Sequence, residues 1–128
     1  MTRVVLSLVY GGLISSEELI AEIVTEDTAR IISVPFCSEK VSPGDLVKHV
    51  NGKIVEVVES VNWLRHVFCD AEISEFAQYF KEYNISVEPL GQMGVFHYGL
   101  VIPNSVTDAE LEKILKESPW TILRLPYI

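Results

Sequence analysis

The stretch from Ile32 to Val58 constrains the fold most, because it contains three short apolar runs separated by two turn signals. The first signal, SPGD at positions 42–45, joins a proline that pre-sets φ to a glycine that accepts a positive φ. The second, Asn51-Gly52, is the pair that a two-residue type I′ hairpin favours. Pro35 cannot donate to a strand ladder and therefore indicates a strand end. This pattern predicts a small, curled antiparallel sheet, which is a barrel-like β unit.

Two more segments before this stretch read as strands. Val4 to Tyr10 alternates and is rich in β-branched residues, and Gly11-Gly12 follows as a break. Ser15 to Val24 is ambiguous, because a serine followed by two glutamates is also a helix start. As a strand, it would pair through a turn at Thr25 to Thr28 with Ala29 to Val34.

The pattern ELIAEIV…ARIISVPFCSEKVSPGDLVKHVNGKIVEVVES resembles a bacterial family of domains of unknown function. In that family a strand pair leads into a (N/V)-(I/V)-P-F element, a loop ending in (S/Y)-x-G-D-(V/L)-V and a strand closing in V-V-E. The resemblance runs from about Glu17 to Ile122 and implies that 15–24 is a strand. The family usually has Trp where this chain has Ile20, and a Ser-Gly-His-Ser-like stretch where it has SVNW at 60–63. Any chemistry of that stretch is therefore lost here, and the resemblance carries over no activity.

The second half is predicted to follow the order β-α-β-β-α-β of the ferredoxin-like fold. A strand is expected at Trp63–Cys69, followed by a helix that Asp70 caps and Asn84 ends. Two strands, Ile85–Leu90 and Val95–Ile102, are then joined by the connection 91–94. A second helix begins at a Thr107 capping box and stops at Pro119, and a last strand is expected at Trp120–Leu125. We therefore expect an α+β chain in which a barrel-like antiparallel subdomain, 1–60, packs on a ferredoxin-like subdomain, 61–128. Edge strands of the second half could pair with a second copy to give a homodimer.

Composition narrows the classes of function. The 128 residues are 48% hydrophobic, enough for a core, and carry a formal charge of −8, which disfavours direct nucleic-acid binding and suits a basic partner. With neither a membrane-spanning run nor a signal-peptide pattern, we expect a cytoplasmic protein. Cys37 and Cys69 lack metal-ligand spacing and are expected as buried, reduced thiols; Trp63, Trp120 and Tyr127 are expected mostly in the core. No metal or cofactor is expected.

No familiar catalytic motif occurs in the sequence, so we do not expect an enzyme. His49, His66 and His97 are interpreted as solvent-facing residues near or within strands. A weaker alternative is a hydrolase or transferase that uses His66 as a base beside Cys69.

The acidic residues suggest a function in binding. Five acids and no Lys or Arg lie between Val4 and Ala29, and a second acidic group lies on or near the first predicted helix. We expect an immunity protein of a contact-dependent or polymorphic toxin system, which blocks the active site of a cognate toxin, most simply a basic nuclease. The residues expected to bind the toxin are Glu17, Glu18, Glu22, Asp70, Glu72 and Glu75. The alternative is a small-molecule-binding or regulatory module with Phe96, Tyr98 and Trp120 at its pocket.

Overall fold

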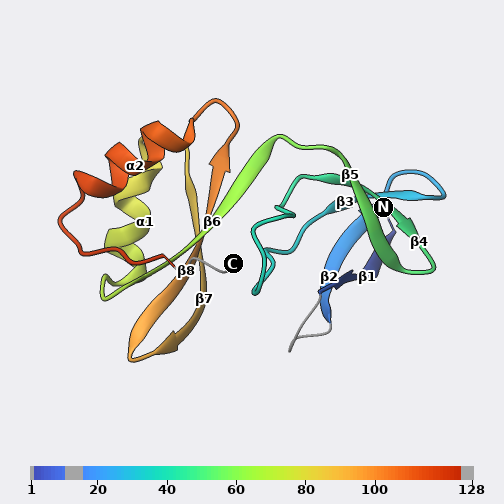
Figure 1. Cartoon of the computed structure of the whole chain (residues 1–128), viewed down its shortest axis with the longest axis horizontal. Coiled ribbons are helices and arrows are strands. Elements are labelled where there is room, and N and C mark those ends of the chain that lie inside the picture. Colours follow the sequence, from blue (N-terminus) through green and yellow to red (C-terminus); the bar gives the residue numbers. More distant parts are fainter. Residues whose placement is uncertain (1, 11–15, 125–128) are drawn as a thin grey trace. The chain divides into compact units, whose positions relative to one another are not determined.

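The computed structural model describes residues 2–10 and 16–124 and shows an α+β chain, mostly of antiparallel strands. Its contacts divide the chain into two units, Met1–Asn62 and Trp63–Ile128. The elements are β1 (Arg3–Val9), β2 (Ser16–Ile23), β3 (Thr28–Ile31), β4 (Leu46–Val50), β5 (Lys53–Glu59), β6 (Asn62–Cys69), α1 (Ile73–Lys81), β7 (Ser86–Met93), β8 (Val95–Pro103) and α2 (Asp108–Lys116) (Figure 1). Among the predicted features, Gly11, Gly12, Ser15, Leu125 and Tyr127 lie outside the described residues.

The first unit is a closed barrel in the order β1-β2-β3-β4-β5. Alternate residues of β1 and β2 face inward, which buries Leu6 and Leu19 at its centre. In the part of the chain that the structure describes, β1 and β5 close the barrel through one parallel pair, Ser7 with Lys53. Residues 16–23 are therefore a strand, as the resemblance implied, whereas β3 ends at Ile31 and not at the predicted Val34. The segment that follows Ile31 leaves the ladder before Pro35 is reached.

Both turn signals behave as their residues predict. Asn51 and Gly52 have φ values of +53° and +76°, the pair of positive angles that a type I′ hairpin needs. Gly44 has a φ of +92° and donates its N–H to the carbonyl of Ile31 at 2.8 Å. The buried carboxylate of Asp45 accepts the backbone N–H of Ser42 at 2.9 Å, so this turn also fixes the end of β3.

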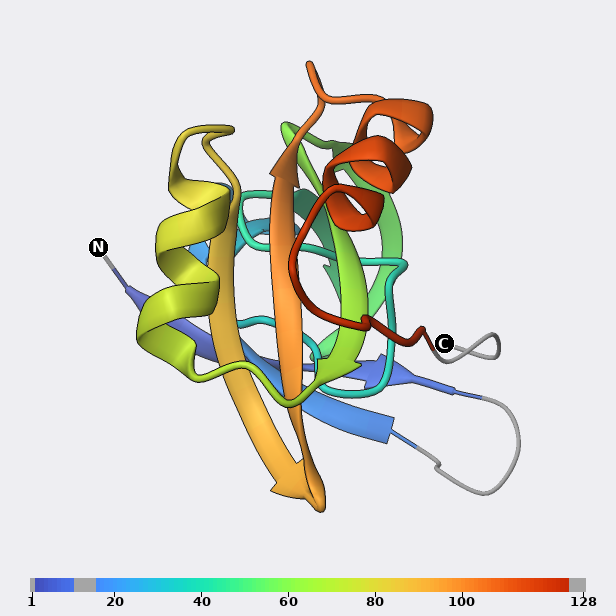
Figure 2. The ribbon, with the colours of Figure 1, turned by 90° about the vertical axis from the view of Figure 1, so that its left-hand side faces the viewer.

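The second unit has a three-stranded sheet in the order β6-β8-β7, and α1 and α2 lie on the same face of that sheet (Figures 1 and 2). Its core lies between helices and sheet and includes Phe76 and Phe80 of α1, Leu111 of α2, and Tyr98 and Leu100 of β8. Trp63 and Trp120 are partly buried against this core. None of the helices in residues 2–10 and 16–124 has the length and apolar character needed to cross a membrane.

Three local predictions for the second unit are wrong. The N-cap of α1 is Glu72, without a side-chain cap, and not Asp70, because two residues separate Asp70 from the helix. The segment 91–94 is not a free connection: β7 continues to Met93, and a register shift after Pro89 lets the strand run on to a turn at Gly94.

The predicted strand at Trp120–Leu125 is also wrong within the described residues, where residues 120–124 make one antiparallel bridge, Leu123 with Phe68. The Trp120 ring packs edge-on against Phe76 and Tyr79 of α1, with centroids 5.3 and 5.6 Å apart. This contact draws the start of the segment toward the helices, away from the path of a regular edge strand.

Candidate functional site

The acidic residues of β2 lie on two different faces of the strand. Leu19 and Ala21 point into the barrel, so Glu18 and Glu22 share the outer face with exposed Ile20, while Glu17 belongs to the inner face at the end of the strand. The structure therefore brings together two of the three predicted β2 carboxylates and separates the third.

Glu17 holds the loop that follows β3. Its carboxylate accepts the backbone N–H groups of Phe36 and Cys37, the latter at 3.1 Å, and the hydroxyl of Tyr10. Burial, the hydrogen bond to Glu17 and the charge of Glu17 raise the pKa of Tyr10 far above its usual value. Burial and the same carboxylate raise the pKa of the half-buried Cys37 thiol. Glu17 thus has a structural task that its sequence position did not indicate.

Glu22 is not part of a continuous acidic surface, because two arginines flank it on the sheet. The register places Arg3 of β1 and Arg30 of β3 directly opposite it on either side, and opposite charges on facing strands attract. Arg30 also pairs with Glu59 at 3.7 Å and donates to the carbonyl of Gly44. The acidic run in the sequence is therefore partly compensated across the strands.

An exposed apolar row crosses the outer face of the barrel beside Glu18. Val5 of β1 pairs with Ile20 of β2, and Ile32 donates its N–H to the carbonyl of Ile20 at 2.9 Å. These three side chains are 59%, 44% and 38% exposed. Glu18 lies one outer position along β2 and accepts the hydroxyl of Ser7 at 3.0 Å. This surface, Val5, Ile20 and Ile32 with Glu18, is called the barrel patch below.

The other predicted carboxylates gather at the start of α1. Asp70, Glu72 and Glu75 are all exposed, with Glu72 as the N-cap and Glu75 in the first turn. The helix dipole stabilises negative side chains at a helix N-terminus. This effect accounts for part of the placement of these carboxylates, so their position alone does not require a binding partner.

The prediction that His66 and His97 face solvent is wrong, because both are buried. Their rings are joined by a hydrogen bond of 2.8 Å between His66 Nδ1 and His97 Nε2. Tyr98 and Leu100 belong to the core on the helix side of the sheet, so neighbouring His97 lies on the opposite face, where its ring stacks on Phe68 at 4.4 Å. This pair could not be predicted from the sequence, because its members lie 31 positions apart.

The proposed base and thiol do not meet. Cys69 is buried in the core on the helix side, whereas His66 lies on the other face of β6. Burial is the main cause of a raised pKa of the Cys69 thiol, which disfavours a reactive thiolate. Tyr98 is also buried, and its hydroxyl donates to the carbonyl of Ala71 at 2.7 Å.

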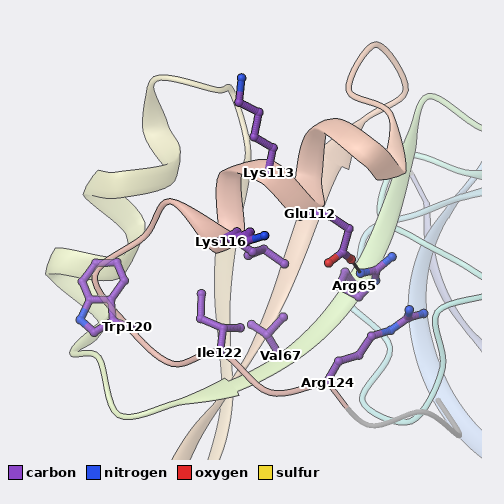
Figure 3. Close-up of a pocket in the computed structure, with 9 residues that line it drawn as sticks. Arg65, Val67, Glu112, Lys113, Lys116, Trp120, Ile122 and Arg124 are labelled. Carbon is purple, nitrogen blue, oxygen red and sulfur yellow. Dashed lines mark hydrogen bonds and ion pairs between the residues drawn. The ribbon is translucent and has the colours of Figure 1, made fainter.

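A cavity of about 650 Å³ lies beside α2 in the second unit (Figure 3). Its apolar lining is formed by Val67, Leu115, Trp120 and Ile122, and its charged lining by Arg65, Glu112, Lys113, Lys116 and Arg124. Of the pocket residues expected from the sequence, Trp120 lines it and Phe96 and Tyr98 do not. The sequence pattern that could have indicated this cavity is the alternation of Arg65 with Val67 and of Ile122 with Arg124. This pattern does not show that the two segments lie beside the same helix.

In Figure 3 the guanidinium groups of Arg65 and Arg124 lie toward one end of the cavity and Trp120 lies at the other. Arg65 is only 4% exposed, yet its guanidinium pairs with Asp108 at 2.7 Å and Glu112 at 2.9 Å. Its Nε has no hydrogen-bond partner among the described residues. The side chain of Lys113 points away from the cavity.

Comparisons with known proteins show the fold and nothing more. No family model and no curated protein matches the chain. A solved structure of a hypothetical protein from Neisseria gonorrhoeae is similar over 97% of this chain and 94% of that one, with a TM-score of 0.71 and 15% sequence identity. The similarity at this identity concerns the backbone and does not extend to a site.

Proposed function

We propose that this chain is an immunity protein that binds a cognate toxin, most simply a basic nuclease, and blocks its active site. The observation that carries the proposal is the barrel patch, in which an exposed apolar row lies beside a carboxylate. Interfaces commonly combine an apolar centre that excludes water with a polar rim that orients the partner. The role proposed here is binding and not catalysis.

The acidic residues supply the electrostatic part of the mechanism. The exposed carboxylates are Glu18 of the barrel patch and Asp70, Glu72 and Glu75 at the start of α1, on a chain of net charge −8. Such groups steer a basic partner toward the surface and can occupy positions at which a nuclease binds the phosphates of its substrate. Glu22 contributes less, because Arg3 and Arg30 flank it. Glu17 contributes by holding the loop at Phe36 and Cys37.

We infer that the protein acts in the cytoplasm, because an immunity protein would meet an incoming nuclease there. For the second unit we infer a ferredoxin-like arrangement, with the segment at Leu123 as a rudimentary fourth strand beside β6. The element order β6-α1-β7-β8-α2 and the hydrogen bonds between Phe68 and Leu123 support this inference.

The test is co-expression of the tagged chain with the product of the gene immediately upstream, followed by affinity capture at low and high salt. We expect a stoichiometric complex whose association slows as salt rises, because exposed charges are screened. Ile20→Asp should weaken binding at least tenfold, and Glu18→Lys should mainly slow association. Glu88→Lys, an exposed acid on β7, is the control with the same change in charge.

Two results would contradict the proposal. One is unchanged affinity after both acidic groups are reversed in charge, by Glu18→Lys together with Glu72→Lys and Glu75→Lys. The other is an equal loss of affinity from Glu88→Lys and Glu18→Lys, which would indicate an effect of net charge and not of a defined surface.

A further inference from the structure

The charges around the α2 cavity are opposite to those of the chain as a whole. The chain has 18 acidic residues and 10 lysines and arginines, yet the lining of this cavity contains four of the cations and one carboxylate, Glu112. The side chain of Lys113 points away from the cavity, and its Nζ lies 4.0 Å from Oε1 of Glu117. The other cations of the lining are Arg65, Lys116 and Arg124. Lys116 makes no ion pair with any residue in the described part of the chain.

Arg65 is held in place before any ligand arrives. Its side chain extends from β6, lies 5.4 Å from the Trp63 ring centroid and is fixed by Asp108 and Glu112 of α2. These two carboxylates bind its terminal nitrogens but leave the buried Nε–H without a partner in the described residues. The guanidinium is therefore a fixed positive group of the lining, and its charge is partly compensated by Asp108 and Glu112.

The rest of the lining suits an apolar body. Val67, Leu115 and Ile122 present aliphatic surface, and Trp120 adds an aromatic ring at the end away from Arg65 and Arg124 (Figure 3). A cavity of about 650 Å³ lies within the range that small-molecule sites occupy. The two guanidinium groups therefore lie toward one end of the cavity, and the rest of the lining is mainly apolar, with Lys116 of α2 between Trp120 and the arginines in Figure 3.

We propose that the α2 cavity binds an amphipathic carboxylate, a molecule with one anionic head and an aliphatic body. The carboxylate is held by the cationic side chains of the lining, Arg65, Lys116 and Arg124, while the aliphatic body covers Val67, Leu115 and Ile122. This site belongs to the second unit, and its existence does not depend on the binding of a toxin by the barrel patch.

The test uses the full chain, labelled with ¹⁵N, and three ligands of the same length: octanoate, 1-octanol and octylammonium. Octanoate should shift the amide signals of Val67, Lys116 and Ile122 in a saturable manner. Octanol should bind at least tenfold more weakly, and octylammonium should give no saturable shift, because the cationic end attracts only the anion. Lys116→Gln should weaken octanoate binding about tenfold and leave octanol binding unchanged.

The control variant is Lys81→Gln, which removes an exposed lysine from α1, outside the cavity, and should leave octanoate binding unchanged. Equal affinities for octanoate and octanol would overturn the proposal, as would shifts confined to residues of the barrel. Unchanged octanoate affinity in Lys116→Gln would overturn it as well. The amide spectrum of each variant reports at the same time whether it is folded.

Discussion

The Nδ1 atom of His66 lies 2.8 Å from Nε2 of His97 on the adjacent strand, and both rings are buried. One nitrogen must donate a proton and the other must accept it, so both facing nitrogens cannot be protonated at once. Burial first, and the proximity of His66 second, lower the pKa of His97 to about 4. This pair therefore links the folded state to a particular state of protonation.

The pair predicts a loss of stability in acid. Below about pH 6.5 the unfolded chain takes up a proton at residue 97, whereas the folded chain resists it down to about pH 4. The free energy of unfolding should therefore fall as the pH falls through this window, by up to about 3 kcal/mol. Urea unfolding at several pH values should show a shallower dependence for His97→Gln than for the parent chain. A dependence that His97→Gln does not reduce would contradict this assignment.

Removal of the Glu17 carboxylate should destabilise the barrel. Glu17→Ala leaves the N–H groups of Phe36 and Cys37 and the hydroxyl of Tyr10 without their acceptor, at a cost of about 2 kcal/mol. The pKa of Tyr10 should fall toward its usual value, because the hydrogen bond and charge of Glu17 help to raise it. Denaturant unfolding and spectroscopic titration of tyrosine measure the two effects. Glu18→Ala, on the exposed face, should cost less than about 0.5 kcal/mol.

A methyl group at position 44 should be less tolerated than one at position 52. Both glycines have positive φ, so alanine is strained by about 1–2 kcal/mol at either. At Gly44 a Cβ would also lie 3.1 Å from Val61 and 3.3 Å from Asn62, whereas at Gly52 it would meet nothing within 4 Å. Thermal unfolding should therefore show a larger loss for Gly44→Ala. Equal losses would mean that backbone strain alone accounts for both.

The start of α2 should depend on its capping box. The Thr107 hydroxyl accepts the N–H of Glu110 at 3.1 Å, and the Glu110 carboxylate accepts the N–H of Thr107 at the same distance. Thr107→Ala should cost about 1 kcal/mol and Thr107→Ser much less, because serine keeps the acceptor. Chemical denaturation of the two variants measures the difference, and equal destabilisation would show that the methyl group of Thr107 matters more than its hydroxyl.

Features encoded within a few residues could be predicted from the sequence. The positive φ at Asn51, Gly52 and Gly44 and the capping box at Thr107 follow from local chemistry. Asn84 is another case, because this residue has a φ of +58° and lies shortly after the end of α1, where the sequence predicted the helix to stop. Each of these depends on steric limits or on hydrogen bonds between near neighbours in the chain.

Features that depend on pairing between residues far apart in the chain could not be predicted from the sequence. The arginines that flank Glu22 come from two other strands, and the register that brings them there is set by the inward-facing residues of the barrel. The same holds for the α2 cavity, because Arg65 and Lys116 lie 51 positions apart and line one cavity only when the helix packs on the sheet. Acidic runs and single histidines therefore say little until their cross-strand partners are known.

The seam between β1 and β5 is the shortest ladder of the barrel within the described residues. Within residues 2–10 and 16–124, β1 and β5 share one ladder pair, Ser7 with Lys53, in which Ser7 donates its N–H to the carbonyl of Gly52 at 2.8 Å, and nearly all of β5 is exposed. Because this seam has the fewest ladder pairs, we expect β5 to detach from β1 more often than the whole chain unfolds. The Ser7 amide should then exchange with deuterated solvent much faster than the amides buried between β1 and β2. The barrel would thus open and close at one seam while the rest of its strands remain paired.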